Sequence, residues 1–564
     1  MIFTIILAVL IVIVACVYYK LVYKQKQIYD AFRSQGIACE PFRPLVGQLP
    51  DMKQYAIRDE FMQYHCDLHL KHGNIYIFNF GPFPRVFIYE PELISDVLKK
   101  FTRYYQKSNL ARGELGSLIG LQNLLLSDHE HHEKSRRMLQ PAFHSDNLKS
   151  MVSIMSYHTT QLIEKWLKEA KTNNQFDLQQ ELSTLTLSVI ISSAFGQITN
   201  NRKESISQTF SKSLDLLQYR TMLMITQIPF LAILPLWKKQ ILDQAVAKIS
   251  RFVNQIILDR KSGLSQSMCS SKDLLDLLLS AKDSDGEGFT QQQIKEEALG
   301  FVIAGHETTG NLLTWCLYIL MTHTHVYEAC QDEVDQVLGS QLTPDYDLLS
   351  KLKVIDAVLH ETLRLYPPAP ILARQCVKEH TIGTNSQRQL RIPVGATIAI
   401  NTYVLHRMEQ FWPRPLEIDY TRWMNGGPKL AHSCCYLPFG AGNRNCIGQT
   451  FALIEAKVIL SMLLQRLKFD IVEGQKIVPE IKITMRPKYG LLAKVTRRIF
   501  ALIQSYLKVP VGTQRKLPAE LLYVRIDRVL SALKQIYFNI RIKQSILLTG
   551  DEGCGKSKLL LTLA

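Results

Sequence analysis

One long stretch, FTQQQIKEEALGFVIAGHETTGNLLTWCLYIL (residues 289–320), places the strongest constraint on the fold. Thr290 followed by Gln293 predicts a capping box at the start of a helix. The second half of the stretch is apolar on nearly every face, which is typical of a helix that runs through a protein interior. Segments with a 3.6-residue apolar period, such as 148–167 and 242–258, predict further helices.

The remaining pattern adds a minor strand component. Residues 73–91 predict a hairpin with its turn at 81–84, because two β-rich runs flank a glycine and two prolines. A helix is expected around 354–365, ending before Pro367. A last helix is expected from Cys446 towards Leu467. We therefore predict a mainly α fold with small sheets.

Residues 1–19 form a run without a charged side chain. As a helix this run would span ~28 Å, close to the ~30 Å hydrocarbon core of a bilayer. A cleavable signal peptide would begin with basic residues, whereas Lys20, Lys24 and Lys26 follow the run. This order favours an uncleaved transmembrane anchor with the body on the cytoplasmic side. We expect residues 20–40 to be a linker and the body to begin at about residue 41.

Charge and cysteine content exclude several classes of protein. The formal net charge of +16 favours a negatively charged partner or surface. Nucleic acid is not expected, because the basic residues are scattered and no reading helix or zinc finger is apparent. The 11 cysteines are odd in number and include no CxxC pair, which indicates neither a disulfide framework nor a zinc site.

The motif AGHETT (residues 304–309) places polar groups in the long apolar helix. Glu307 and Thr308 need partners there, because buried polar groups are costly without hydrogen bonds. Taken alone, the motif is read more simply as a helix kink with locally satisfied hydrogen bonds. The functional alternative is a small-molecule pocket beside the helix, with a proton-delivery pair next to it.

Two further motifs follow towards the carboxyl end. In HETLRLYPP, Glu361 and Arg364 share one helix face, and alone they are typical of a surface salt bridge. In FGAGNRNCIG, glycines allow a tight turn, and Arg444 lies two residues before Cys446. Peptide N–H groups near a helix start stabilise a thiolate, so Cys446 is a candidate for chemistry and not merely for packing.

The third motif resembles the haem loop of the cytochrome P-450 family. The pattern FxxGxRxCxG is filled by Phe439, Gly442, Arg444, Cys446 and Gly448. The other two motifs match the family's AGxET and ExxR patterns in the same order along residues 41–498. The resemblance implies the cytochrome P-450 fold for this body and haem b, iron protoporphyrin IX, as its cofactor.

The resemblance also implies roles for single residues. Cys446 would be the proximal thiolate ligand of the haem iron, with Phe439 packed near its sulfur. The residues that would meet the haem propionates are Arg444, Arg136, His132, Arg374 and His406. His132 departs from the family's usual tryptophan, in a WxxxR pattern. Arg422 would complete a structural network with Glu361 and Arg364.

In this family Thr308 would hydrogen-bond dioxygen and Glu307 would help to relay protons. The implied reaction inserts one oxygen atom from O₂ into a lipophilic substrate such as a fatty acid, sterol or foreign compound. Electrons would come from NADPH through a membrane-bound flavoprotein reductase, at the endoplasmic reticulum. The alternative is a haem isomerase or dehydratase that needs no reductase, although Glu307 and Thr308 argue against it.

Residues 499–564 lie outside the family pattern. The segment GDEGCGKS fits the phosphate-cradling GxxxxGK[ST] loop through Gly550, Gly555, Lys556 and Ser557. A nucleotide-binding module is therefore a further hypothesis for this extension. We do not expect ATP hydrolysis, since only the first strand, loop and helix of such a domain are present.

Overall fold

The structure is a computed structural model that describes residues 1–170, 174–196, 203–223, 234–268, 273–283, 286–384, 388–498, 545–548 and 559–562. The phosphate-loop candidates Gly550, Gly555, Lys556 and Ser557 lie outside these residues.

The described chain is mainly helical, as predicted. The α-helices are α1 (Ile2–Tyr18), α2 (Lys24–Arg33), α3 (Leu49–Ile57), α4 (Phe61–His72), α5 (Pro91–Ser95), α6 (Asn109–Ile119), α7 (His129–Leu139), α8 (Ser145–Glu169), α9 (Leu178–Phe195), α10 (Lys203–Met222), α12 (Lys239–Lys261), α13 (Leu274–Ser280), α14 (Gln291–Thr322), α15 (Thr324–Leu338), α16 (Tyr346–Leu349), α17 (Lys353–Leu365), α18 (Thr402–Leu405) and α19 (Gln449–Arg466).

The strands are short and form small sheets. They are β1 (Ala38–Cys39), β2 (Ile75–Phe80), β3 (Phe83–Ile88), β4 (Tyr105–Gln106), β5 (Gln175–Asp177), β6 (Ile371–Cys376), β7 (His380–Ile382), β8 (Leu390–Ile392), β9 (Thr397–Asn401), β10 (Leu467–Ile471), β11 (Pro479–Ile481), β12 (Met485–Pro487), β13 (Leu492–Arg497), β14 (Ser545–Leu548) and β15 (Leu559–Thr562).

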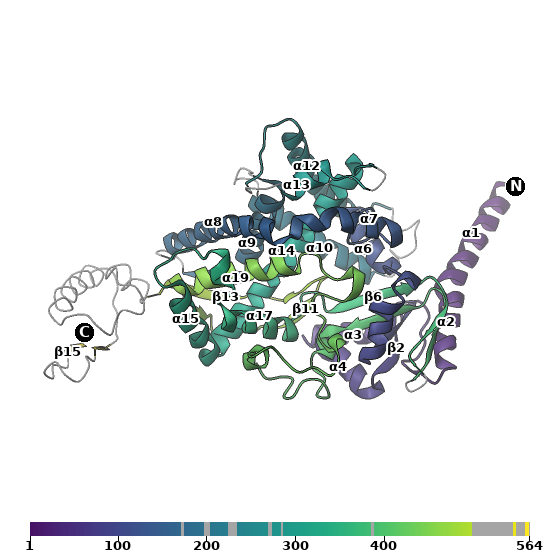
Figure 1. Ribbon diagram of the computed structural model, residues 1–564. Helices are drawn as coiled ribbons and strands as arrows, with labels where there is room; N and C mark the ends of the chain where they lie inside the picture. The colour runs from purple at the N-terminus through teal and green to yellow at the C-terminus, as the bar shows by residue number, and fades with distance from the viewer. Residues whose placement is uncertain are drawn as a thin grey trace.

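Helix α14 runs through the middle of the helical body (Figure 1), where it packs against α9, α12, α17 and α19. The predicted capping box is present: Thr290 Oγ1 accepts from the Gln293 N–H, and Gln293 Oε1 accepts from the Thr290 N–H. From Leu312 to Leu317 every residue is buried, which explains why the sequence there shows no polar face.

Glycines on α14 let α9 approach closely. A Cβ at Gly305 would lie 2.8 Å from Cγ1 of Ile190, and one at Gly310 would lie 3.1 Å from Cα of Ser183. The missing side chain at Gly305 therefore serves helix packing, whereas its neighbour Ala304 keeps accessible surface on another face of α14.

A six-stranded mixed sheet, in the order β1-β2-β3-β9-β6-β4, forms a second core beside the helices. The predicted hairpin is β2–β3, but its turn is confined to residues 81–82. Phe83 and Pro84 already pair with Phe80 and Asn79, so the turn predicted at 81–84 was two residues too long. The last helix, α19, begins at Gln449 and not at Cys446, because the glycine loop stays irregular up to Gly448.

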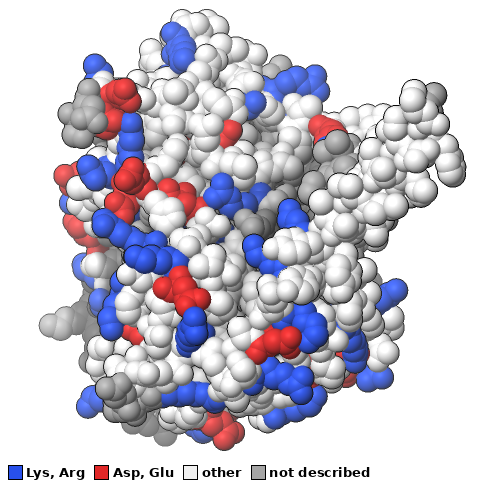
Figure 2. Space-filling view, turned by 90° about the vertical axis from the view of Figure 1, so that its right-hand side faces the viewer, with Lys and Arg blue, Asp and Glu red and all other residues white. Residues whose placement is uncertain are grey.

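The amino-terminal helix projects from the body as an uncharged arm (Figures 1 and 2). Residues 3–33 form one continuous helix long and apolar enough to cross a membrane. The linker expected at 20–40 is therefore largely helical: a π-helical turn, Tyr19–Tyr23, leads into α2. Helix α2 has an amphipathic pattern, and its buried residues Ile28, Tyr29 and Phe32 join the core around the sheet.

Candidate functional site

Cys446 lies at the end of a glycine loop, just before the N-terminus of α19. Its N–H donates to Phe439 O at 2.9 Å, which closes the loop. A Cβ at Gly442 would lie 1.9 Å from Leu98 O, and φ is +75° there, so this position requires glycine. Burial raises the pKa of the Cys446 thiol, while the Gly448 N–H and the Arg136 charge act in the opposite direction. The side chain nonetheless keeps accessible surface.

A cluster of basic side chains from three parts of the chain lies beside this loop. Arg136 of α7 donates to Asn445 O at 2.7 Å and to Asn445 Oδ1 at 2.6 Å. Arg444 Nη2 donates at 2.8 Å both to Ser127 O and to Asp128 Oδ1. Its Nη1 is buried and has no hydrogen-bond partner among the described residues. A buried guanidinium nitrogen without a partner fits an anionic group of a cofactor.

The cluster shifts the pKa values of its members. The pKa of His132 falls to about 3, because the side chain is buried and lies near Arg444 and Arg136. The pKa of Arg374 falls to about 10 through burial and the charge of Arg444. Burial together with Arg374 and Arg444 also lowers the pKa of Lys107 to about 7. Such mutual repulsion is relieved when anionic groups bind among the cations.

Lys107 and Asp128 belong to this site, although sequence reasoning did not select them. Asp128 accepts from the Lys107 N–H at 3.0 Å and forms an ion pair with Arg112 as well as with Arg444. Neither residue lies in a recognisable motif. Asp128 is the N-cap residue of α7, but such a residue usually serves only the helix.

His406 does not join the cluster, and this corrects the expectation that it meets a propionate. Both of its ring nitrogens are used inside the protein: Nδ1 donates to Arg364 O at 3.1 Å, and Nε2 accepts from the Leu437 N–H at 2.9 Å. The ring is fully buried, and burial lowers its pKa to about 3. His406 therefore connects α17 to the segment that leads into the glycine loop.

The Glu361–Arg364 pair is buried, with side chains 1% and 0% exposed, so it is not the surface salt bridge that the motif alone suggested. Arg364 Nε and Nη2 donate to the two carboxylate oxygens of Glu361. The other N–H donors of Arg364 bind the carbonyl oxygens of His406, Pro415 and Glu417. Every donor of the guanidinium is thus satisfied.

Arg422 extends this network, with Nε 3.5 Å from Glu361 Oε1. The Trp423 Nε1–H donates to Glu361 Oε2 at 2.8 Å, and the Asp419 N–H donates to Oε1 at 3.0 Å. The network ties α17 to residues 406–423. Glu361, Arg364 and Arg422 thus lie in one network.

The AGHETT turn of α14 presents three different environments. Ala304 is exposed, although it lies in the middle of a core helix. Thr308 is partly exposed, and its hydroxyl donates to Ala304 O at 2.6 Å. Glu307 is buried and accepts from Asn311 Nδ2 at 3.3 Å and from Thr484 Oγ1 at 3.1 Å. The acid and the hydroxyl of the motif thus have separate partners.

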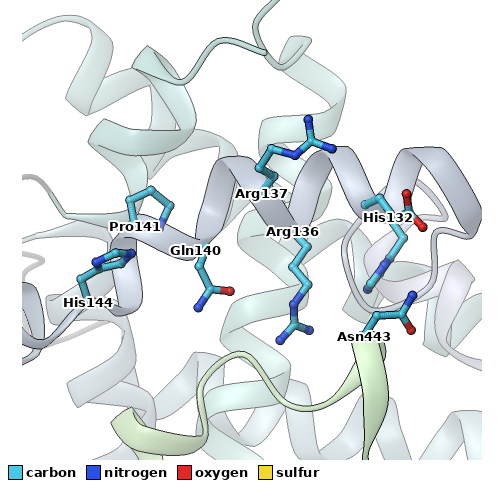
Figure 3. Close-up of a pocket in the computed structure, with 8 residues that line it drawn as sticks. His132, Arg136, Arg137, Gln140, Pro141, His144 and Asn443 are labelled. Carbon is cyan, nitrogen blue, oxygen red and sulfur yellow. The ribbon is translucent and has the colours of Figure 1, made fainter. Parts of the chain in front are cut away.

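A groove of about 490 Å³ opens beside the cysteine loop, between α7 and Asn443 (Figure 3). Its described lining is mostly basic or polar: His132, Glu133, Arg136, Arg137, Gln140, Pro141, His144 and Asn443. Arg136 points towards the loop that carries Asn443, whereas Arg137 points away from it. The groove therefore offers cations on the same side of the molecule as the cysteine loop.

These features define the class of protein. A single cysteine before a helix N-terminus can provide a thiolate, and buried cations can receive two carboxylates. The central helix α14 presents an exposed alanine, Ala304, and a partly exposed threonine, Thr308, four residues apart. These side chains would fit haem, with the Cys446 thiolate as iron ligand and with Arg136, Arg374 and Arg444 for its carboxylates.

Comparison with known proteins agrees with this class. The family model described as Cytochrome P450 matches residues 38–494. A cytokinin hydroxylase of Arabidopsis thaliana is 31% identical over 83% of this chain and 92% of the relative. An 11-oxo-beta-amyrin 30-oxidase of Glycyrrhiza uralensis is 31% identical over 73% of this chain and 78% of the relative.

Among solved structures, the cytochrome P450DA heme domain is similar with a TM-score of 0.70 and 26% identity. The similarity covers 82% of this chain and 98% of that domain. The chain belongs to the cytochrome P450 family. It is an oxidoreductase of the haem monooxygenase type, with an apolar amino-terminal helix that fits a membrane anchor.

Proposed function

We propose that this enzyme uses electrons from NADPH, delivered by a flavoprotein reductase, to insert one oxygen atom of O₂ into a C–H bond of a lipophilic small molecule. Bound haem supplies the activation of O₂ and the oxidising power. The observation that carries the proposal is that Cys446 keeps accessible surface beside Arg136, Arg374 and Arg444, a group of cations in which the Arg444 Nη1 has no hydrogen-bond partner in the described chain.

The residues of this chain would hold the cofactor and control protons. Cys446 would ligate the iron through its sulfur, with Phe439 packed near it. Arg136, His132, Arg374 and Arg444 would bind the propionates, and Lys107 would join them. Positive charges at this cluster would retain haem, because burying its two propionate carboxylates without counter-charges is costly.

Thr308 and Glu307 would serve the proton steps. The Thr308 hydroxyl, now bound to Ala304 O, would turn its Oγ1 towards the bound oxygen substrate. The Glu307 carboxyl would deliver protons from its Oε atoms to that hydroxyl. Ala304 would leave room on the same helix for the organic substrate.

The relatives and the amino-terminal helix both favour a lipophilic substrate. The two relatives are named for a hydroxylation and for an oxidation of small organic molecules. A membrane-spanning helix would keep this catalytic body beside a bilayer, where apolar compounds concentrate. We therefore propose a lipophile such as a fatty acid, sterol or foreign compound.

The reductase would dock over the groove beside α7. Its lining supplies two arginines against one glutamate, and the protein carries a formal net charge of +16. An acidic docking face complements this surface and raises the association rate at low salt. Arg137→Glu should slow reductase-driven NADPH consumption and reduce its dependence on salt.

We further propose that the protein resides in the endoplasmic reticulum membrane as a single-pass protein, with residues 41–498 as a haem domain on the cytoplasmic side. Basic residues just after the apolar helix favour that orientation. Protease protection of tagged termini in sealed microsomes tests it, since only a carboxyl-terminal tag should be digested.

The ferrous–CO difference spectrum tests the haem-thiolate centre. The purified full-length protein should show the absorbance band of thiolate-ligated haem, and Cys446→Ala should abolish it. Cys316→Ala, which alters a buried cysteine of α14, is the control and should keep the band. A protein that binds haem but shows the same spectrum after Cys446→Ala would contradict the assignment.

The need for a reductase separates the two haem mechanisms. Incubation with a mixture of fatty acids and sterols, scored by product mass, should yield products that gain 16 mass units only with NADPH and reductase. Product formation without either would favour a reductase-independent isomerase or dehydratase.

A further inference from the structure

The acid of the AGHETT motif is held by a hairpin that is distant in sequence. Thr484 lies between β11 and β12, and its Oγ1 donates to Glu307 Oε2 at 3.1 Å. Asn311 Nδ2 contacts both groups, at 3.3 Å from Glu307 Oε2 and 3.1 Å from Thr484 Oγ1. All three side chains are buried. The two donors therefore fix the position of the carboxylate.

The tip of this hairpin has an unusual backbone. Ile483 has φ of +63°, a conformation that β-branched residues rarely adopt. The Lys482 N–H donates to Thr484 O at 2.8 Å across the tip. This tight turn directs the neighbouring Thr484 side chain to α14. Strained backbone of this kind persists where the surroundings determine it, often near functional sites.

Contacts on both sides hold the hairpin in place. Towards α14, Trp315 Nε1 donates to Met485 O at 3.3 Å. The Met485 N–H donates to Pro368 O, just after α17, at 2.9 Å. Towards α10, Gln218 Nε2 donates to Ile481 O at 2.9 Å. The hairpin thus connects α10 to the part of α14 that carries Glu307.

The same region has further ion pairs to α10. Asp215 of α10 pairs with Lys482 at 3.1 Å and also with Arg486. Because these contacts flank Thr484 on either side along the chain, the position of its hydroxyl depends on how the hairpin sits against α10. A shift of the hairpin would withdraw one of the two donors from Glu307.

We propose that Thr484 is a positioning residue for proton delivery: through its hydroxyl, the β11–β12 hairpin sets the orientation of the Glu307 carboxyl group. The inference rests on the proposed role of Glu307 and names the residue that controls it. Without the hydroxyl, the carboxyl group keeps only Asn311 as a donor and samples other rotamers, so the proton reaches Thr308 less often.

The test uses the full-length haem protein with NADPH and a flavoprotein reductase, and no added organic substrate. The rate of NADPH consumption and its solvent deuterium isotope effect are measured for wild type, Thr484→Val, Thr484→Ser and Glu307→Gln. We expect Thr484→Val and Glu307→Gln to lower the rate several-fold and to raise the isotope effect at least twofold. Thr484→Ser, which keeps the hydroxyl, should have a rate and an isotope effect close to those of wild type.

A second measurement does not depend on turnover. Unfolding midpoints in urea are compared for Thr484→Val in the wild-type background and in Glu307→Leu. If the hydroxyl binds Glu307, the shift should be smaller in the second background, because the partner is already absent. Thr314→Val is the matched control, since this buried α14 hydroxyl donates to a backbone carbonyl, Gly310 O. Its shift should be equal in both backgrounds.

The outcomes are distinguishable. A wild-type rate and isotope effect in Thr484→Val, with Glu307→Gln impaired, would overturn the inference and leave the role of Glu307 intact. Equal urea shifts in both backgrounds would also overturn it. If Glu307→Gln itself behaves as wild type, the proposed proton delivery fails, and the inference fails with it. The CO spectrum of each variant reports separately whether the haem-thiolate centre is present.

Discussion

Glu455 is a carboxyl group enclosed within the haem-domain core. It lies on α19, is fully buried, and neither carboxyl oxygen meets hydrogen-bond geometry with a partner in the described chain. Burial raises its pKa well above the ordinary value, and the nearby Thr309 hydroxyl opposes this only in part. The folded state therefore keeps a proton that the unfolded state releases above pH ~4.3.

The sign of the pH dependence follows from this proton. Between the unfolded and folded pKa values the folded state binds more protons, so stability falls as pH rises. For wild type we expect stability to fall relative to Glu455→Gln as pH rises above ~4.3, by at most about 1.4 kcal/mol per pH unit. Urea unfolding at several values from about pH 5 to 8 measures it. Parallel curves for the two proteins would show that Glu455 does not carry the proton.

His132 gives a second prediction for a single residue. Its low pKa makes it neutral, so it can donate one N–H to a propionate without adding charge. His132→Trp keeps an N–H donor and should retain haem. His132→Phe lacks the donor and should lose haem about tenfold faster, by analogy with outer ligands of metal sites. Transfer of haem to apomyoglobin measures the rate, and equal rates would contradict the role.

At the scale of elements, the buried network of Glu361, Arg364 and Arg422 links α17 to residues 406–423. Glu361→Gln removes the charge that compensates Arg364, whose side chain is fully buried. Breaking a buried pair from one side costs about 3–5 kcal/mol in the free energy of unfolding. We expect a loss of this size by urea denaturation, together with reduced haem content.

A surface pair provides the control. Glu379 and Arg391 form an ion pair with side chains 47% and 68% exposed. Glu379→Gln should change the free energy of unfolding by at most about 1 kcal/mol, because exposed pairs are screened by water and salt. If both variants are equally stable, the buried network contributes no more than a surface salt bridge.

Elements with a strong local signal could be predicted from the sequence. Helix α14 has both a capping box and a long apolar run, and it begins within one residue of the capping pair. Helix α17 ends just before its two prolines. The cysteine loop could be selected because its glycines, arginine and cysteine have the spacing FxxGxRxCxG. Gly442 has the close backbone contact that this spacing suggested.

Contacts made by tertiary structure could not be predicted in this way. Lys107 joins the cation cluster only because a loop folds back beside α7, and Thr484 reaches Glu307 across 177 positions of sequence. His406 followed a family pattern, yet its two nitrogens bind the backbone of Arg364 and Leu437, and no motif predicts these contacts. Residues 20–40 were predicted to be a linker, whereas α2 packs three residues, Ile28, Tyr29 and Phe32, against a sheet that is formed by distant segments.

At the scale of the whole molecule, the apolar amino-terminal helix and the body share one continuous helical segment. Residues of α1 are almost all exposed, as expected of a helix surrounded by lipid. By contrast, Leu21 is buried after the end of α1, and Phe32 has no accessible surface. The packing of α2 therefore makes it part of the folded body, and we propose that the anchor ends near residue 20.

Two truncations test where this boundary lies. Deletion of residues 2–20 removes the apolar span but keeps Leu21 and all of α2. We expect this variant to fold, to show the haem-thiolate spectrum and to be released from membranes by alkaline carbonate, which full-length protein should resist.

Deletion of residues 2–33 removes α2 as well. Tyr29, whose hydroxyl donates to Glu40 O at 2.9 Å, and Phe32 then leave the core around the sheet. Loss of one buried phenylalanine side chain costs about 3–5 kcal/mol, so this variant should unfold at lower urea than the shorter deletion or fail to retain haem. The two deletions differ only in residues 21–33. Equal unfolding midpoints for both would show that α2 is a linker that merely rests on the body, and would move the boundary of the folded unit back to residue 34.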